Sequence, residues 1–278
     1  MATKTKKGEF YLFAVNLIEK LIESLKKFFS QNLLDFLTRW GIRIGHYGLL
    51  LAALIGFLFS FVVAIRSNSF RAFLLGIIWV LVIFVIQFIA KRFSNAGATL
   101  IENNPSQLSS PSFLDCVAFL SMIGGLIILI YSIINAIQLK SLEVFLSGLA
   151  IFFLLEVITL VTFNPKSITI SLTKSSSAGQ EAIGIVTYFL KLFLRLVPII
   201  FGIGVAVGTV ILFIHFIGGF GERLAFFWQR ANTGDAGYIL FAGLLPFLSY
   251  LIFVFYYLLI DIIKAILAVP QKLDNLKK

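Results

Sequence analysis

The sequence predicts an all-α, polytopic integral membrane protein with six transmembrane helices. Of its 278 residues, 59% are hydrophobic and only 13% are charged, and the mean hydropathy is +1.00. Soluble domains carry about 25% charged residues. The chain also contains six apolar runs, each near the roughly 20 residues that a helix needs to cross the hydrocarbon core. These observations exclude a water-soluble globular enzyme.

The first predicted element is an amphipathic segment, residues 1–45, which lies before the first apolar run. Within residues 8–30 the apolar side chains recur with a helical period on one arc, and charged side chains occupy the other arc. Beyond Asn32 this register slips, so we expect a break there and a second short helix that ends at Trp40. The segment is expected either to lie in the membrane interface or to pack on the protein's own cytosolic face.

The membrane domain is predicted over residues 46–269 and is followed by a short basic tail, 270–278. Under the predicted topology the cytosolic segments hold 18 Lys and Arg residues and the outer loops hold 5. Because Lys and Arg collect on the cytosolic side, we expect both termini in the cytosol. The six transmembrane helices are predicted at residues 46–65, 71–91, 114–138, 143–163, 192–217 and 238–262.

The six helices are predicted to form three hairpins. The second helix of each hairpin begins with a similar tetrad that ends in glycine, at residues 73–76, 145–148 and 240–243, with separations of 72 and 95 residues. The loops after the second and fourth helices each contain a short β-like stretch, at residues 99–101 and 168–172. These similarities indicate either an internal duplication or the shared composition of apolar segments.

The fifth helix carries a predicted kink and a predicted packing face. Pro198 removes a backbone hydrogen bond, which a neighbouring helix can compensate. Gly204 and Gly208 clear side chains from one face, so that another helix can approach closely. The partner on this face is expected to be either another helix of the same chain or a second protomer.

The candidate functional residue at membrane depth is Glu156 in the fourth helix, because charged groups inside the bilayer are costly and often functional. Arg195, at similar predicted depth, is its expected partner. Three interpretations remain open: a protonatable acid on a solute or proton path, a structural Glu156–Arg195 charge pair, and an accidental lipid-facing position.

Neither a cofactor nor a metal site is predicted. The chain has a single cysteine, Cys116, which excludes an internal disulfide and a cysteine cluster. His46 and His215 are expected at opposite membrane surfaces, so they cannot bind one metal or one haem together. Each is expected to be an interfacial histidine, with single-histidine pigment ligation as the alternative.

The outer loop between the last two helices, residues 218–238, combines glycines with aromatic and basic residues. It is expected to form an interfacial or re-entrant helix anchored by Trp228. Alternatively, the loop is a docking surface for a partner, formed by Arg223, Phe227, Trp228 and Arg230.

The predicted function is that of a non-enzymatic integral membrane subunit or scaffold that oligomerises or assembles within a larger membrane complex. The scarcity of polar groups at membrane depth and the lack of a nucleotide-binding or catalytic motif favour it. The alternative is a small-solute or ion transporter or channel that uses Glu156. The expected partners are the lipid bilayer and either further copies of the chain or other membrane subunits. The net charge of +10 is attributed to membrane topology, and no nucleic-acid partner is expected.

Overall fold

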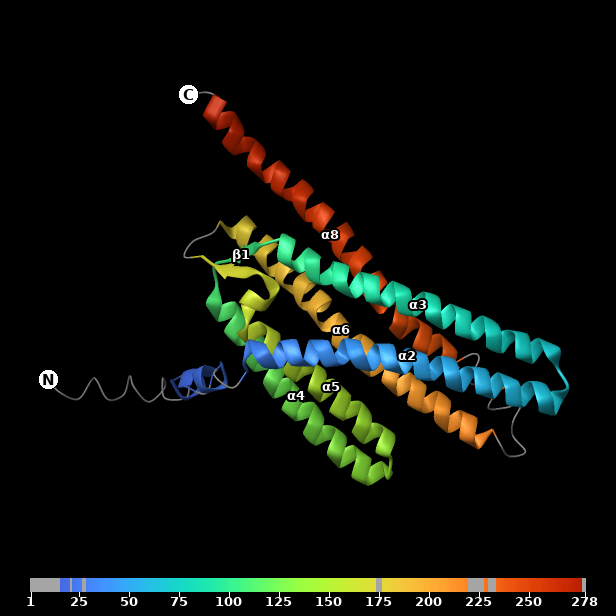
Figure 1. Ribbon diagram of the computed structural model, residues 1–278. Coiled ribbons are helices and arrows are strands. Elements are labelled where there is room, and N and C mark those ends of the chain that lie inside the picture. The colour runs from blue at the N-terminus through green and yellow to red at the C-terminus, as the bar shows by residue number, and fades with distance from the viewer. Residues whose placement is uncertain are drawn as a thin grey trace. The chain divides into compact units, whose positions relative to one another are not determined.

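The computed structural model describes residues 16–20, 22–26, 29–173, 177–219, 228–229 and 234–276. Within these ranges, six helices are long and apolar enough to cross a membrane, so the protein is an all-α, multi-pass membrane protein. The helices are α2 (Gln31–Ser67), α3 (Phe70–Asn103), α4 (Pro111–Leu139), α5 (Leu142–Phe163), α6 (Ala178–Gly218) and α8 (Ala236–Leu276) (Figure 1).

The chain divides into two compact units, which are described separately. Unit 1 comprises Met1–Asp35 and Pro105–Tyr188, and unit 2 comprises Phe36–Asn104 and Phe189–Lys278. Unit 1 therefore contains α4, α5 and the first turns of α6. Unit 2 contains α3, α8 and most of α2 and α6.

Each predicted apolar run lies inside one of the six helices, but the helices are longer than the runs. The expectation of a separate short helix ending at Trp40 is wrong, because α2 continues without a break from Gln31 to Ser67. A helix is held by backbone hydrogen bonds four residues apart and does not need an apolar arc at every turn. The expected boundary between the amphipathic segment and the membrane domain, at residue 45, falls inside α2. The roles assigned to residues 1–45, 46–269 and 270–278 stay predictions.

Unit 1 is built on the antiparallel hairpin of α4 and α5. The Thr159 hydroxyl on α5 donates to the Ala118 carbonyl on α4 over 3.2 Å, which links the two helices. Strand β1 (Ser106–Leu108) pairs in parallel with β2 (Ile170–Leu172), which follows the 3-10 turn η1 (Pro165–Ile168). The whole hairpin is thus the connection between two parallel strands.

One of the two predicted β-like stretches is wrong. Residues 99–101 belong to the last turns of α3, where a helix already under way overrides the β preference of Thr99 and Ile101. The other stretch, residues 168–172, contains β2. Its partner β1 lies a few residues beyond the end of α3, in a serine-rich segment.

The N-terminal residues of unit 1 contact the base of the same hairpin. Lys26 and Asp115 form an ion pair of 2.6 Å. The Asn164 side-chain amide donates to the Phe29 carbonyl over 2.8 Å, and the Phe29 and Phe163 rings pack with their centroids 6.0 Å apart. These contacts favour the alternative in which the N-terminal segment packs on the protein itself.

Unit 2 is a bundle of four helices joined by a buried apolar core. The Trp79 indole on α3 donates to the Ala52 carbonyl on α2 over 2.9 Å, and the Thr209 hydroxyl on α6 donates to the Gly48 carbonyl over 3.1 Å. These bonds satisfy polar groups that lipid would leave unpaired. The core includes Leu49, Phe59, Ile83, Phe201, Val205 and Ile239.

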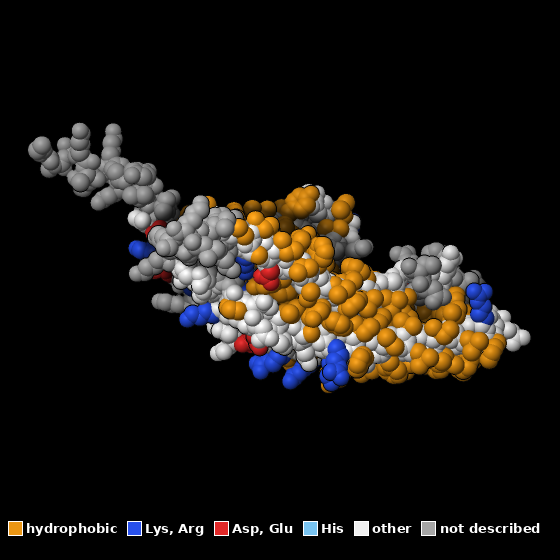
Figure 2. Space-filling view, turned by 90° about the horizontal axis from the view of Figure 1, so that it is seen from above, with side chains coloured by type: hydrophobic (Ala, Val, Ile, Leu, Met, Phe, Trp, Pro, Cys, Tyr) orange, Lys and Arg blue, Asp and Glu red, His pale blue; other side chains and the backbone are white. Residues whose placement is uncertain are grey.

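Bulky apolar side chains also cover much of the outside. Figure 2 shows one face of the molecule, on which most of the exposed side chains are hydrophobic. On α3 the exposed set includes Leu74, Ile78, Leu81, Val85 and Phe88. Such a surface suits helices that are surrounded by lipid rather than water.

The α2–α3 turn and the α4–α5 turn have the same backbone conformation and lie 72 residues apart in the sequence. Asn68 ends α2 and Lys140 ends α4, each with a left-handed φ of 49°. Ser69 and Ser141 then stand at the N-cap positions of α3 and α5. The shared conformation follows from the turn, since each helix must end and reverse within two residues.

The close contact inside each of these hairpins is also equivalent. A Cβ added to Gly76 would lie 2.6 Å from the Ser60 Cβ, and one added to Gly148 would lie 2.1 Å from the Ser132 Cβ. The pairs again differ by 72 residues. Between residues 60–76 and 132–148, the identical pairs are Ser60 and Ser132, Ala64 and Ala136, Ile65 and Ile137, Ser69 and Ser141, Phe73 and Phe145, Leu74 and Leu146, and Gly76 and Gly148.

Both hairpins end at an Asn-Pro pair, although α3 has 34 residues and α5 has 22, so these two ends are not 72 residues apart. The Asn104 and Asn164 side chains each donate over 2.8 Å to the carbonyl four residues earlier. The shared turns and glycine contacts support an internal duplication of the hairpin. The tetrad of the third hairpin lacks the equivalent contact, because Gly243 on α8 packs against Ile86 of α3 rather than against α6.

Candidate functional site

The intramembrane carboxylate Glu156 lies on α5, at its interface with α4 in unit 1. A Cβ added to Gly125 of α4 would lie 3.1 Å from the Glu156 Oε1 atom, so the glycine makes the room that the carboxyl group occupies. This oxygen is buried and has no hydrogen-bond partner among the described residues. A polar atom buried in this way is costly, which makes Glu156 the leading functional candidate within unit 1.

Arg195, the expected partner of Glu156, lies on the part of α6 that belongs to unit 2. It is half-buried, and Lys191, one turn earlier on the same helix, is fully buried. The predicted Glu156–Arg195 pair therefore joins residues of two different units and stays a prediction.

Polar side chains lie beyond Glu156, toward the C-terminal end of α5. Thr162 shares a hydrogen bond of 2.6 Å with the Tyr188 hydroxyl, and Tyr188 is fully buried in unit 1. The Phe113 ring packs edge-on against the Tyr188 ring at 5.6 Å. These contacts fix the first turns of α6 against the hairpin that carries Glu156.

The glycine pair of α6 faces α8 within unit 2. A Cβ added to Gly204 would lie 3.0 Å from the Ala242 Cβ, and one added to Gly208 would lie 2.7 Å from Ile239 Cγ1. Pro198, earlier on α6, has its carbonyl oxygen 2.7 Å from where a Cβ of Gly41 would lie. The structure therefore places Gly204 and Gly208 against a helix of the same chain.

The two histidines have different surroundings in unit 2. The His46 ring on α2 packs against the Phe201 ring at 5.6 Å, and its Nε2 atom has no hydrogen-bond partner among the described residues. His215, near the end of α6, has its Nδ1 hydrogen-bonded to the carboxylate of Asp235. Asp235 was not expected from the sequence, because it lies in the predicted outer loop and outside any apolar period.

Three of the four loop residues, Arg223, Phe227 and Arg230, lie outside the described residues. Trp228 is described, and its ring packs edge-on against Phe59 in unit 2 at 5.4 Å. It is half-buried and packs against the apolar core of unit 2. The docking role of the loop stays a prediction.

A carboxylate that the sequence reasoning missed is Glu181, in the first turn of α6. Its oxygens accept hydrogen bonds from the Ser109 backbone amide at 2.8 Å, the Ser109 hydroxyl at 2.5 Å and the Ser110 backbone amide at 3.1 Å. Ser110 is itself the N-cap of α4, and its side chain accepts from the Phe113 amide. Glu181 thus places a negative charge at the positive end of α4.

Within the described ranges no group of three His, Cys, Asp or Glu residues could hold a metal ion. Cys116 is free and exposed. Neither a protein-family model, nor a curated protein, nor a solved structure matches the chain. The roles considered below therefore rest on the contacts of these residues.

Proposed function

We propose that the protein is a non-enzymatic integral membrane subunit or scaffold, which oligomerises or assembles within a larger membrane complex. The observation that carries the proposal is that polar side chains inside the helices form hydrogen bonds to neighbouring helices. Trp79, Thr209 and Thr159 each donate to a backbone carbonyl of a neighbouring helix in their own unit. Side chains used in this way hold helices together and leave few polar groups to line a passage.

Two cavities of unit 2 support the same proposal. A groove of about 320 Å³ between α2 and α6 in unit 2 is lined mainly by apolar side chains, among them Leu54, Leu58, Val210 and Phe213. A smaller cavity of about 30 Å³ lies between Phe59, Trp79 and Trp228. Apolar cavities of this kind do not solvate an ion or a polar solute.

Native mass spectrometry of the protein, extracted from its own membrane in mild detergent, tests this proposal. We expect either a homo-oligomer or an assembly with other subunits in fixed stoichiometry. A lone monomer with no retained subunit, together with solute or proton flux in proteoliposomes, would contradict the proposal and favour transport.

Transport is the second candidate function, and the buried Oε1 atom of Glu156 favours it. The duplicated hairpin is a further point in its favour, since many transporters are built from internal repeats. Under this alternative the carboxyl group would bind and release a proton or a cation, and Glu156→Gln would abolish flux while leaving the assembly intact.

We expect instead that Glu156→Gln lowers the melting temperature and that proteoliposomes of the unmodified protein show no flux to lose. The physical reason is the proposed charge pair, which the neutral amide cannot form with Arg195. A double-mutant cycle with Arg195→Gln measures the pair, because the double variant should then lose no more stability than either single variant. Strictly additive losses would contradict the pair, and flux that depends on Glu156 would contradict the subunit function.

A further inference from the structure

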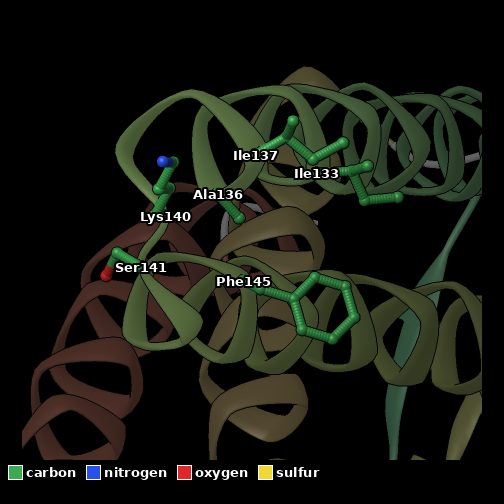
Figure 3. Close-up of a pocket in the computed structure, with 6 residues that line it drawn as sticks. All are labelled: Ile133, Ala136, Ile137, Lys140, Ser141 and Phe145. Atoms are coloured by element: carbon green, nitrogen blue, oxygen red, sulfur yellow. The ribbon is translucent and has the colours of Figure 1, made fainter.

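A shallow, open cavity lies at the turn between α4 and α5 in unit 1. Its volume is about 320 Å³, near the lower end of the roughly 300–1,000 Å³ typical of small-molecule pockets. Its walls are apolar, whereas a cation and a hydroxyl stand at the turn. Figure 3 shows Ile133, Ala136 and Ile137 on α4, Phe145 on α5, and Lys140 and Ser141 at the turn.

The duplicated hairpin of α2 and α3 shows what differs at this place. There Phe61 is the equivalent of Ile133, and its ring packs against Phe73, the equivalent of Phe145, at 6.4 Å. A third ring, that of Phe57, packs against both. The α4–α5 hairpin therefore carries a smaller side chain where its copy has an aromatic ring. It also carries Lys140 where the copy has the neutral Asn68.

We propose that this cavity binds an anionic phospholipid, with an acyl chain between α4 and α5 and the phosphate near Lys140. Both helices are long and apolar enough to span the membrane, so their turn lies at a membrane surface. Ile133 is seven residues before Lys140 on the helix and thus lies about 10 Å deeper. A phospholipid has its charged phosphate at the membrane surface and its acyl chains below. A cation at the surface above an apolar cavity matches this arrangement.

The hydroxyl of Ser141 supplies a second polar group for the phosphate. Its oxygen accepts a weak hydrogen bond of 3.4 Å from the Val144 amide, as an N-cap does. The hydroxyl hydrogen remains available to donate to a phosphate oxygen. Lys140 is exposed at the rim, where its charge can meet a headgroup without the cost of burial.

The test uses the full chain in phosphatidylcholine vesicles that contain a phosphatidylglycerol probe with a photoreactive group on its acyl chain. Crosslinked residues are mapped by mass spectrometry after illumination. We expect labelling at Ile133, Ile137 or Phe145, and stronger labelling than with a phosphatidylcholine probe that carries the same chain.

Two variants copy the first hairpin into the second. Ile133→Phe fills the cavity and is expected to abolish labelling there. Lys140→Asn removes the cation and is expected to reduce phosphatidylglycerol labelling about five-fold, to the level of the phosphatidylcholine probe. Arg66→Asn is the control, because it removes a basic residue from the turn of the other hairpin and should leave labelling at the α4–α5 turn unchanged.

Equal labelling by the two probes, or labelling that Lys140→Asn does not change, would overturn the proposal, since the contact would then be that of any surrounding lipid. Absence of labelling at the α4–α5 turn by either probe would overturn it as well, because lipid would then not occupy the cavity. If Ile133→Phe fails to fold, Lys140→Asn with an unchanged melting temperature still decides the outcome.

Discussion

Replacing Gly202 with alanine is expected to lower the free energy of unfolding of unit 2 by about 3 kcal/mol, the upper end of the usual cost of overpacking. Gly202 of α6 meets Gly41 of α2 where the two helices cross. An added Cβ would lie 2.3 Å from the Gly41 carbonyl oxygen and 2.7 Å from its Cα. Both are backbone atoms, which cannot rotate away as a side chain does, so the helices themselves must separate.

Intrinsic tryptophan fluorescence during thermal unfolding in detergent measures this effect. The three tryptophans, Trp40, Trp79 and Trp228, all belong to unit 2. The matched control is Gly237→Ala on α8, where an added Cβ would have no neighbour within 4 Å. We expect the control to keep the melting temperature or to raise it slightly, since alanine favours a helix. Equal melting temperatures for Gly202→Ala and the unmodified protein would show that α2 and α6 do not cross at these glycines.

The second large effect is expected from Glu181→Ala, which should destabilise the start of α4 by about 2–3 kcal/mol. The substitution removes the charged acceptor of three hydrogen bonds, two of them from the backbone amides of Ser109 and Ser110. It also removes the negative charge from the N-terminal end of α4. Glu181→Gln keeps an acceptor oxygen without the charge and should lose less.

Cys116 provides the measurement, because it is the single cysteine of the chain, is exposed, and lies in the second turn of α4. A nitroxide label there should gain mobility in Glu181→Ala. Glu23→Ala, which removes an exposed carboxylate of the same unit, is the control and should leave the spectrum unchanged. An unchanged spectrum in Glu181→Ala would contradict the anchoring role of Glu181.

Hydropathy was sufficient to predict the six helices but not where they end. The second apolar run was expected to stop at residue 91, yet α3 continues through Arg92 to Asn103. Apolar composition reports where lipid surrounds a helix, whereas the helix itself lasts as long as its backbone bonds do. The same reason explains why α2 begins at Gln31, well before the first apolar run.

The candidate site was predictable only in part. Glu156 could be identified because a carboxylate inside an apolar run is visible in the sequence, whichever face of the helix it occupies. Its neighbour Gly125 could not, because the register of α4 against α5 depends on contacts such as Ser132 with Gly148. Glu181 is separated from Ser109 by 72 residues, and no local pattern connects the two. Long-range pairings of this kind arise from the tertiary fold.

The order of the two units along the chain has a consequence for biosynthesis. Unit 2 begins with α2 and α3 and is completed only after the roughly 80 residues that belong to unit 1 have been made. At about 5–20 residues per second, α2 and α3 wait roughly 4–17 s before synthesis reaches the part of α6 that belongs to unit 2. During this interval the face of α2 around Gly41 has no α6 to meet, so it must be covered by lipid or by the insertion machinery. A chain cut between Asn104 and Pro105 would leave both halves holding incomplete units, and either unit would form only when the two halves reassociate.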